Sequence, residues 1–405
     1  MAMPAKTVEI VPGIIWVGAE DWQRRLFDSL IPLPYGTSYN AYLVVGREKA
    51  ALIDTVSADF EEELLTKVAG TLEPERLDYV VMNHAEPDHA GAIPRVMAAA
   101  PNARLVVTRK GAEMAETFYH VPEARRLVVK DSDMIDLGGK TLRFIEAPWL
   151  HWPETMFTFA VEDRVLFPGD FFGSHIASDS LFDDEVGDIL LPEAKRYYAE
   201  IMMPFTRMVA AGLDKAIAVE AKTIAPSHGP VHRNPGRIID AYERWARGPL
   251  AKKALVVYVS MWGSTQRLAQ AITGAISAEG VEAVPYDLSV ADISHVARDL
   301  VDASCIVVGS PTVLGGPHPQ MAYALTLVKA LRPRGKLAAY FGSYGWGGGA
   351  ASQVKGLLEP AGFEIVEALE IKGPPGEREL ESAVKLGRDV ARRVKESLGS
   401  GKGKA

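Results

Sequence analysis

The sequence predicts an α/β protein with two domains, a sandwich of two β-sheets flanked by helices and then a doubly wound parallel sheet. Its 405 residues suit two domains of roughly 100 to 200 residues each. The chain opens with paired short strands, whereas strands and helices alternate after residue 250. Between these parts, Arg247-Gly248-Pro249-Leu250 interrupts a helical pattern. We therefore expect one domain over residues 1–250 and another over residues 251–405.

The composition is that of an ordinary globular protein, with 48% hydrophobic and 24% charged residues. The net charge of -8 gives no basic surface for nucleic acid. Cys305 is the only cysteine, which excludes an intramolecular disulfide and a Cys-x-x-Cys metal site. Residues 1–6 lack the apolar stretch of a signal peptide, and no run of about 18 apolar residues is present to span a bilayer. We expect a cytoplasmic protein that binds neither nucleic acid nor membrane.

Short strands dominate the start of the first domain. Apolar patterns predict strands over residues 8–11, 14–17, 39–45 and 50–54. An amphipathic pattern from Glu61, with a glycine stop at Gly70, predicts a helix. The apolar run from Leu77 to Met82 then predicts a buried strand.

The most informative segment follows that strand. Met82-Asn83-His84-Ala85-Glu86-Pro87-Asp88-His89 gathers two imidazoles and two carboxylates within six residues. Side chains alternate along an extended chain, so His84, Glu86 and Asp88 point roughly one way, and the following turn brings in His89. Burying these groups unpaired costs several kcal/mol each, and one or two divalent metal ions relieve that cost. The alternative is a polar loop that is rich in His and Asp by chance.

Three further residues that can bind metal stand just after predicted strands. His151 follows the strand over residues 141–145, Asp170 follows residues 165–167, and His228 follows residues 223–225. Taken singly, His151 or His228 is more often an ordinary core or surface histidine. Because α/β folds usually keep their sites at the ends of strands, we expect all these side chains to converge on one metal site.

This set of residues resembles the metallo-β-lactamase fold in the form used by flavodiiron proteins. Residues 16–22, 36–42 and 196–201 also resemble the pattern of that family. The resemblance implies two iron ions, with these ligands: His84, Glu86 and His151 on one iron, Asp88, His89 and His228 on the other, and Asp170 as the bridge. Hydrolases of the fold usually have a histidine where Glu86 stands, and a carboxylate there favours iron over zinc.

The same resemblance implies catalytic roles for His175 and Tyr198. These residues fall where the family places hydrogen-bond donors over the substrate pocket. The alternative for each is ordinary packing. The family commonly has a pocket histidine where this chain has Asp28. This departure leaves the preference between dioxygen and nitric oxide open.

The second domain alternates strands with helices, which indicates a parallel sheet. We expect strands over residues 254–259, 283–287, 304–309 and 338–342, and a helix over residues 265–279. Between the first strand and this helix, the segment from Ser260 to Thr265 offers hydroxyl and N–H groups that form an anion cradle. Neither a Walker loop nor a Gly-x-Gly-x-x-Gly turn is present there.

Two later loops follow strands at the same edge of this sheet, and the second offers aromatic rings to a planar ligand. The segment from about residue 252 to 395 resembles flavodoxin, which implies one bound FMN. The residues implied in binding it are Ser260, Met261, Trp262, Gly263, Ser264, Thr265, Pro311, Thr312, Val313, Leu314, Gly315, Ser343, Tyr344, Gly345, Trp346, Gly347 and Gly348. The alternative is that Trp262, Tyr344 and Trp346 only fill surface grooves.

A flavin domain and a diiron domain on one chain indicate redox chemistry, because a hydrolase needs no electrons. The resemblance implies an oxidoreductase that reduces dioxygen to water or nitric oxide to nitrous oxide. No rubredoxin-like segment follows residue 395, so we expect electrons from a partner such as rubredoxin. Family likeness also implies a head-to-tail homodimer or a dimer of dimers. The tail from about residue 396 is expected to be disordered.

Two other hypotheses remain open from the sequence. One is a zinc-dependent hydrolase of the same fold, fused to an FMN domain that carries electrons or acts as a sensor. The other is a structural metal site joined to a flavin domain that serves for docking. Metal content and gas turnover distinguish these hypotheses from the redox enzyme.

Overall fold

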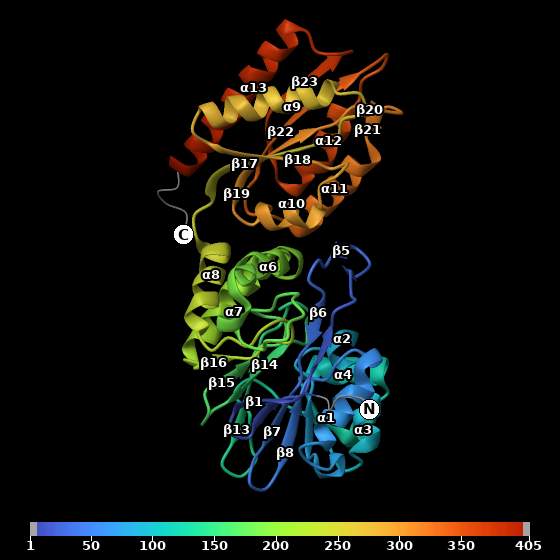
Figure 1. Ribbon diagram of the computed structural model, residues 1–405, viewed down its shortest axis with the longest axis vertical. Coiled ribbons are helices and arrows are strands. Elements are labelled where there is room, and N and C mark those ends of the chain that lie inside the picture. Colours follow the sequence, from blue (N-terminus) through green and yellow to red (C-terminus); the bar gives the residue numbers. More distant parts are fainter. Residues whose placement is uncertain (1–5, 400–405) are drawn as a thin grey trace. The chain divides into compact units, whose positions relative to one another are not determined.

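The computed structural model describes residues 6–399, and the chain divides into two compact units between Ala246 and Arg247 (Figure 1). This division lies a few residues before the predicted boundary at residue 250. No helix within residues 6–399 has the length and hydropathy to cross a membrane.

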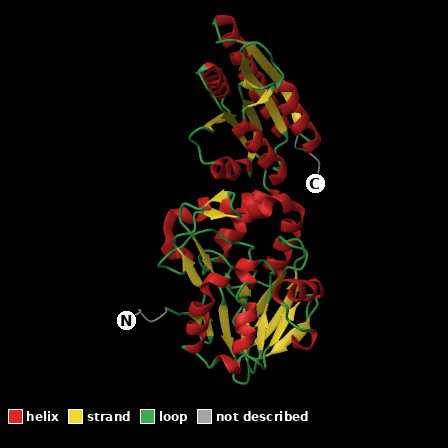
Figure 2. Cartoon of the chain, turned by 90° about the vertical axis from the view of Figure 1, so that its right-hand side faces the viewer, coloured by secondary structure: helices red, strands yellow, loops and turns green. Residues whose placement is uncertain are grey.

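Two packed sheets form the centre of the first unit (Figure 2). The larger sheet has the order β1 (Val8–Val11), β2 (Ile14–Trp16), β7 (Tyr42–Val45), β8 (Ala50–Ile53), β9 (Tyr79–Val81), β10 (Arg104–Val107) and β11 (Arg126–Val128). The smaller sheet has the order β12 (Met134–Asp136), β13 (Thr141–Glu146), β14 (Met156–Ala160), β15 (Val165–Phe167) and β16 (Thr223–Ile224). Each sheet is antiparallel at one end and parallel at the other.

An apolar core lies between the two sheets. The larger sheet contributes Val44, Ile53 and Val81, and the smaller one contributes Leu142, Phe144 and Phe167. On the outer face of the larger sheet, a second core packs against the helices α1 (Glu61–Ala69), α3 (Ile93–Ala99) and α4 (Arg109–Tyr119). The helices α6 (Leu190–Tyr197), α7 (Thr206–Ala218) and α8 (Pro235–Arg247) lie on the side of the smaller sheet (Figure 1). The predicted αββα sandwich is therefore confirmed.

The single strand predicted over residues 39–45 is wrong, because the chain forms two strands there. Thr37–Tyr39 is β6, which pairs with β3 (Ala19–Asp21), and β7 begins only at Tyr42. Between them, the side-chain amide of Asn40 donates hydrogen bonds to the carbonyls of Pro226 and Gly229 at 2.9 and 2.7 Å. The break in the strand thus anchors the loop that carries His228.

The second unit is a parallel sheet with helices on both faces (Figure 1). Its strands have the order β18 (Glu282–Asp287), β17 (Ala251–Tyr258), β19 (Ala303–Gly309), β22 (Leu337–Tyr344) and β23 (Glu364–Lys372). Its helices are α9 (Ser264–Ala278), α10 (Ile293–Leu300), α11 (Pro319–Leu331), α12 (Ala350–Leu358) and α13 (Glu377–Gly399). The short strands β20 (Thr312–Val313) and β21 (Gly316–Pro317) form a hairpin after β19. The doubly wound sheet is as predicted.

The prediction of a disordered tail from about residue 396 is wrong for its first residues. Helix α13 continues to Gly399, because Val390, Ala391 and Val394 bury an apolar stripe in the core of the second unit. Residues 400–405, which complete the predicted tail, lie outside the described residues.

Candidate metal centre and flavin site

The seven predicted metal ligands come together at the ends of strands in the first unit. His84 and Glu86 follow β9, Asp88 and His89 lie on the short helix α2 (Pro87–Ala90), His151 lies between β13 and β14, Asp170 follows β15, and His228 follows β16. Asn83 supports the first of these loops, because its backbone and side-chain N–H groups donate to the buried Asp54 carboxylate at 2.7 and 3.0 Å.

The ligand atoms form two groups that meet at Asp170. His84, Glu86, His151 and Asp170 offer atoms within 4.8 Å of one another, and so do Asp88, His89 and His228. Oδ2 of Asp170 is 3.2 Å from Nε2 of His151 in the first group. Oδ1 of Asp170 is 2.9 Å from Nε2 of His89 in the second group. The two oxygens of one carboxylate thus face different groups, which is the arrangement of a bridging ligand.

Several of these atoms are deeply buried and make no hydrogen bond of normal geometry to a described residue, and some only face another ligand as an ion pair, such as Oδ2 of Asp88 and Nε2 of His228 at 3.1 Å. They include both carboxylate oxygens of Asp88, both ring nitrogens of His89, Oδ1 of Asp170 and Nε2 of His228. A buried polar atom without a partner costs roughly 1 to 3 kcal/mol. Two metal ions between the groups would satisfy these atoms, so the residues fit a dinuclear centre. Imidazole and carboxylate together suit iron.

Protons compete with a metal ion for these imidazoles. Burial lowers the pKa of His84, but hydrogen bonds with Glu154 and Glu86 outweigh burial and raise it to about 10. Burial also lowers the pKa of His89, and the charges of Asp170 and Asp88 outweigh it, raising the pKa to about 9. Metal binding must therefore displace protons from these rings.

Hydrogen bonds behind two of the rings determine which nitrogen faces the cluster. Nδ1 of His84 lies 2.7 Å from Oε1 of Glu154, and Nδ1 of His228 donates to the carbonyl oxygen of Ser38. With the proton held at Nδ1, each ring presents its Nε2 lone pair to a metal ion.

The structure brings His175 to the cluster. Its ring centroid is 4.9 Å from that of His228, and its Nδ1 is 2.9 Å from Oγ1 of Thr37. Burial and the neighbouring His228 hold the pKa of His175 well below its usual value, so the ring is neutral. Nε2 of His175 is buried and has no hydrogen-bond partner within residues 6–399. This nitrogen is available to a bound molecule.

The structure does not place Tyr198 where the sequence suggested. The ring of Tyr198 packs against Tyr242 and Trp245, with centroid distances of 5.2 and 5.4 Å. The preceding residue, Tyr197, instead faces Asp170, and burial and the charge of Asp170 raise the pKa of its hydroxyl. Its ring lies 4.8 Å from that of His175. Adjacent residues point about 100° apart around a helix, so the two tyrosines face different surroundings. Tyr197 is therefore the tyrosine that the structure places beside the cluster.

Asp28 stands beside the cluster, in the turn of a hairpin formed by β4 (Leu26–Phe27) and β5 (Ile31–Pro32). The hairpin is held by Phe27, whose ring lies 4.7 Å from that of His175. Burial, together with the charges of Glu86 and Asp88, raises the pKa of Asp28. A carboxyl group therefore occupies the position where a histidine is usual in the resembled family.

The loops at one edge of the second unit enclose a cavity of about 300 Å³. The predicted flavin residues that line it are Ser260, Met261, Trp262, Ser264, Thr265, Pro311, Thr312, Ser343, Tyr344, Gly345 and Trp346. Gly263 does not line it, but its φ of +83° turns the chain into α9, a conformation that favours glycine. Val313, Leu314, Gly315, Gly347 and Gly348 are outside the lining as well.

Sequence reasoning missed four residues of these two sites. Gly373 and Pro374 line the flavin cavity, where they follow β23, a strand that was not predicted. Glu154 lies only three positions after His151 and was detectable as a buried-site carboxylate next to a ligand. Tyr197 was missed because it is adjacent to Tyr198, and the sequence does not show which of the two tyrosines faces the cluster.

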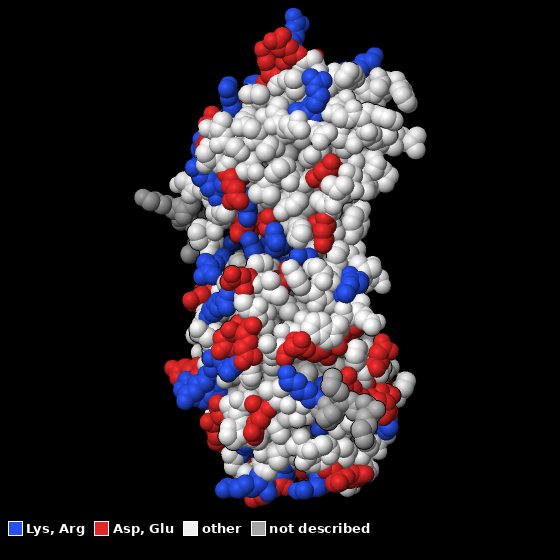
Figure 3. Space-filling view, in the orientation of Figure 1, with Lys and Arg blue, Asp and Glu red and all other residues white. Residues whose placement is uncertain are grey.

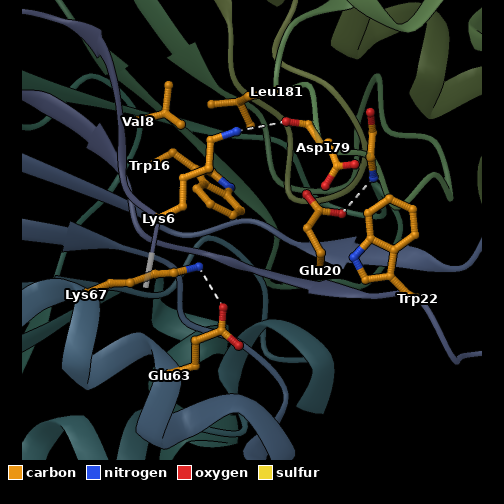
Figure 4. A pocket seen from close by; sticks show the side chains of 10 residues that line it. Lys6, Val8, Trp16, Glu20, Trp22, Glu63, Lys67, Asp179 and Leu181 are labelled. Carbon is orange, nitrogen blue, oxygen red and sulfur yellow. Dashed lines mark hydrogen bonds and ion pairs between the residues drawn. The ribbon is translucent and has the colours of Figure 1, made fainter. Parts of the chain in front are cut away.

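A separate cavity of about 250 Å³ lies in the first unit (Figure 4). Trp16, Glu20 and Lys67 line it, and none of the seven metal ligands does. The backbone N–H of Ser178 donates to Oε2 of Glu20 at 3.1 Å. Burial nevertheless raises the pKa of Glu20 to about 8. This carboxyl group is therefore mostly protonated at neutral pH.

Known families match both units. The family described as "ODP family beta lactamase" matches residues 37–229, and the Flavodoxin family matches residues 256–387. A curated relative, "Nitric oxide reductase" of Moorella thermoacetica, is 41% identical over 397 residues, which are 96% of this chain and 99% of the relative.

Solved structures agree with these matches. The rubredoxin oxygen:oxidoreductase of Desulfovibrio gigas has a TM-score of 0.94 at 31% identity, covering 98% of this chain and 100% of that chain. The flavodiiron protein of Giardia intestinalis has a TM-score of 0.93 at 33% identity, covering 97% and 98%. The fold and both sites thus define a two-domain oxidoreductase with a β-lactamase-like and a flavodoxin-like domain. The chain belongs to the flavodiiron protein family.

Proposed function

We propose that this protein reduces dioxygen to water, nitric oxide to nitrous oxide, or both, at a diiron centre that receives electrons through FMN. The observation that carries this proposal is the position of Asp170 between two groups of buried ligands, with one oxygen toward each. A carboxylate in this position holds two metal ions close enough to act on one small molecule.

In this proposal the first iron would be held by His84, Glu86 and His151, and the second by Asp88, His89 and His228. Asp170 would offer one carboxylate oxygen to each. When bound, the iron ions and FMN supply the electrons for the reduction, up to the four that dioxygen needs to become water.

The surrounding residues provide proton donors and limit access to water. Burial, together with the charge of Asp170, raises the pKa of Tyr197, which indicates an O–H group next to the cluster. Nε2 of His175 is buried and unpartnered within the described chain, so a bound oxygen atom can meet it. Phe27 packs on the ring of His175 and shields it from solvent.

In the second unit, the cavity formed by the three loops would hold FMN. The segment from Ser260 to Thr265, at the N-terminus of α9, would hold the phosphate, because backbone N–H groups there favour an anion. Thr312 and the aromatic pair Tyr344 and Trp346 would hold the ring. Trp346 is 97% exposed, as expected for a side chain that a bound ligand would cover.

The two alternative hypotheses account for less of the molecule. A zinc hydrolase gives no reason for a carboxylate at Glu86 or for the flavin-binding unit. A purely structural metal site needs no unpartnered neutral histidine such as His175 beside it. Family membership also favours the oxidoreductase over the hydrolase.

We further propose that the protein is a cytoplasmic, head-to-tail homodimer, alone or as a dimer of dimers, and takes electrons from rubredoxin or a similar carrier. Large apolar side chains around both sites support this arrangement. Trp22, Leu26 and Tyr35 are 44–49% exposed around the hairpin near the metal ligands. Near the flavin cavity, Trp262 and Leu314 are almost fully exposed. Figure 3 shows few charged side chains on the visible surface around β20 and β21.

Anaerobic turnover tests the function. Purified protein, with its iron and FMN counted, is supplied with electrons by a reductase and rubredoxin and given dioxygen or nitric oxide in separate runs. Consumption of either gas supports the proposal, and the ratio of the two rates assigns the preferred substrate. No consumption of either gas by protein with two irons and one FMN per chain would contradict it. Sedimentation of an active monomer would contradict the dimer.

A further inference from the structure

The hydrogen-bonding partner of His84 differs in charge from that of His228. Glu154 lies in the loop before β14 and is 2% exposed. Its Oε1 is 2.7 Å from Nδ1 of His84 and accepts a hydrogen bond from the backbone N–H of Ala85 at 2.8 Å. One carboxylate oxygen thus holds both the ring and the following backbone of a metal ligand.

The backbone of Glu154 is itself fixed. Its carbonyl oxygen accepts a hydrogen bond from Oγ1 of Thr108 at 2.9 Å, and Thr108 caps helix α4 through a bond from the N–H of Gly111. The backbone of Glu154 is therefore anchored to the start of a helix.

The other carboxylate oxygen, Oε2, is buried and has no hydrogen-bond partner within residues 6–399. Glu154 also lines a cavity of about 120 Å³, together with Thr108, Glu146 and Thr155. A cavity of this size holds on the order of four water molecules at about 30 Å³ each. The hydrogen bonds between the Glu154 carboxylate and described residues lie at Oε1, behind the ring of His84.

We infer that Glu154 is a positioning residue that presents Nε2 of His84 to the first metal ion and makes the two metal positions unequal in affinity. This inference rests on the proposed diiron function. A carboxylate that accepts a hydrogen bond from the Nδ1–H group makes the imidazole a stronger metal ligand than a neutral carbonyl in the same position would. His84 in the first group has the carboxylate, whereas His228 in the second group has the carbonyl of Ser38. The first position therefore binds its ion more tightly.

Stepwise metal binding tests this inference without measuring activity. Metal-free protein that retains its FMN is titrated anaerobically with Co²⁺, and the visible absorption of the bound ion is recorded. Wild-type protein is expected to bind two ions with unequal constants. Glu154→Gln keeps an acceptor oxygen but removes the charge. It is expected to weaken the binding of one ion by roughly 10- to 100-fold and to leave the binding constant of the other unchanged. It should also alter the absorption of the weakened ion.

Glu146→Gln is the matched control, because Glu146 lines the same cavity but makes no hydrogen bond to His84 within residues 6–399, and it is expected to bind both ions as wild type does. Glu154→Asp should restore part of the lost affinity, since it returns the charge on a shorter side chain. Equal constants for the two ions in wild type would overturn the inference, whether or not the variants fold. So would unchanged binding in Glu154→Gln. Fewer than two ions in wild type would overturn the diiron proposal itself, and this inference with it.

Discussion

At the scale of single residues, Asp170 determines whether the two groups of ligands act as one centre. Burial raises the pKa of this carboxyl, but the surrounding histidines, with His89 the strongest, outweigh burial and hold the pKa well below its usual value. The group is therefore ionised and offers an oxygen to each side. No other carboxylate among the seven ligands is close to histidines of both groups in this way.

Asp170→Asn should lose one or both metal ions and abolish gas turnover, because an amide nitrogen cannot replace the second ligand oxygen. FMN should remain bound, since its cavity lies in the other compact unit. Metal and flavin counts per chain provide the measurement. Asp183→Asn is the control, because Asp183 is equally buried but bonds to the backbone N–H of Arg233. Two ions retained in Asp170→Asn at wild-type turnover would refute the bridging role.

Glu20 makes the free energy of unfolding decrease as pH rises. Burial raises its folded-state pKa from 4.5 to about 8. Below pH 4.5 the folded and unfolded states both hold the proton, so stability is unaffected. From there to about pH 8, folding must take up a proton, and the free energy of unfolding falls as pH rises, by at most about 5 kcal/mol.

Glu20→Gln removes this dependence, because the amide does not ionise. The variant should unfold at a higher temperature than wild type at pH 8, and the difference should shrink toward zero at pH 5. Thermal unfolding at both pH values provides the measurement. Glu75→Gln, a change at an exposed glutamate, should follow wild type. If Glu20→Gln and wild type show the same change in melting temperature between pH 5 and pH 8, the raised pKa is wrong.

At the scale of elements, one strand joins the loops of the flavin site. Glu370 on β23 accepts a hydrogen bond from Oγ1 of Thr312 at 3.2 Å and a longer one from the N–H of Gly349 at 3.4 Å. Thr312 lines the cavity and begins the β20–β21 hairpin. Gly349 ends the loop that contains Trp346. One carboxylate oxygen of Glu370 thus connects two separate loops of the flavin site.

Glu370→Ala should weaken FMN binding by roughly tenfold, because it removes two hydrogen bonds worth about 1 kcal/mol each, one of them long. The metal content should not change. Fluorescence titration of the flavin-free protein with FMN measures the constant. Glu367→Ala on the same strand is the control, since Glu367 is exposed and its carboxylate accepts a hydrogen bond from the adjacent N–H of Ala368 rather than from a loop of the flavin site. Equal affinity in both variants would contradict the role of Glu370.

Much of the fold and of the metal site could be predicted from the sequence, because both depend on local patterns. His84, Glu86, Asp88 and His89 are close in the chain, and apolar strands lead directly into the later ligands. The choice between Tyr197 and Tyr198 could not be predicted, since it depends on the rotation of α6 against the sheet. Glu154 is detectable as a carboxylate near His151, but its bond to His84 could not be predicted, because that bond spans 70 positions.

At the scale of the whole molecule, the chain carries an electron-accepting unit and a gas-reducing unit that form separate compact bodies. Each site is bordered by exposed large apolar side chains, such as Leu314 on the second unit, which is fully exposed and does not line the flavin cavity. Apolar patches of this kind are typical of surfaces that meet a partner. A second copy of the chain that presents its complementary unit would cover both patches at once.

The most direct test of the central claim is reoxidation of the reduced protein by each gas. Protein with counted iron and FMN is reduced fully under anaerobic conditions. It is then mixed with dioxygen or with nitric oxide, and the absorbance of the flavin is recorded. The account predicts rapid flavin reoxidation by at least one gas in wild type, and slow reoxidation in Asp170→Asn with its FMN still bound. Equal rates in the two proteins would contradict it, because electrons would then leave the flavin without passing through the metal centre.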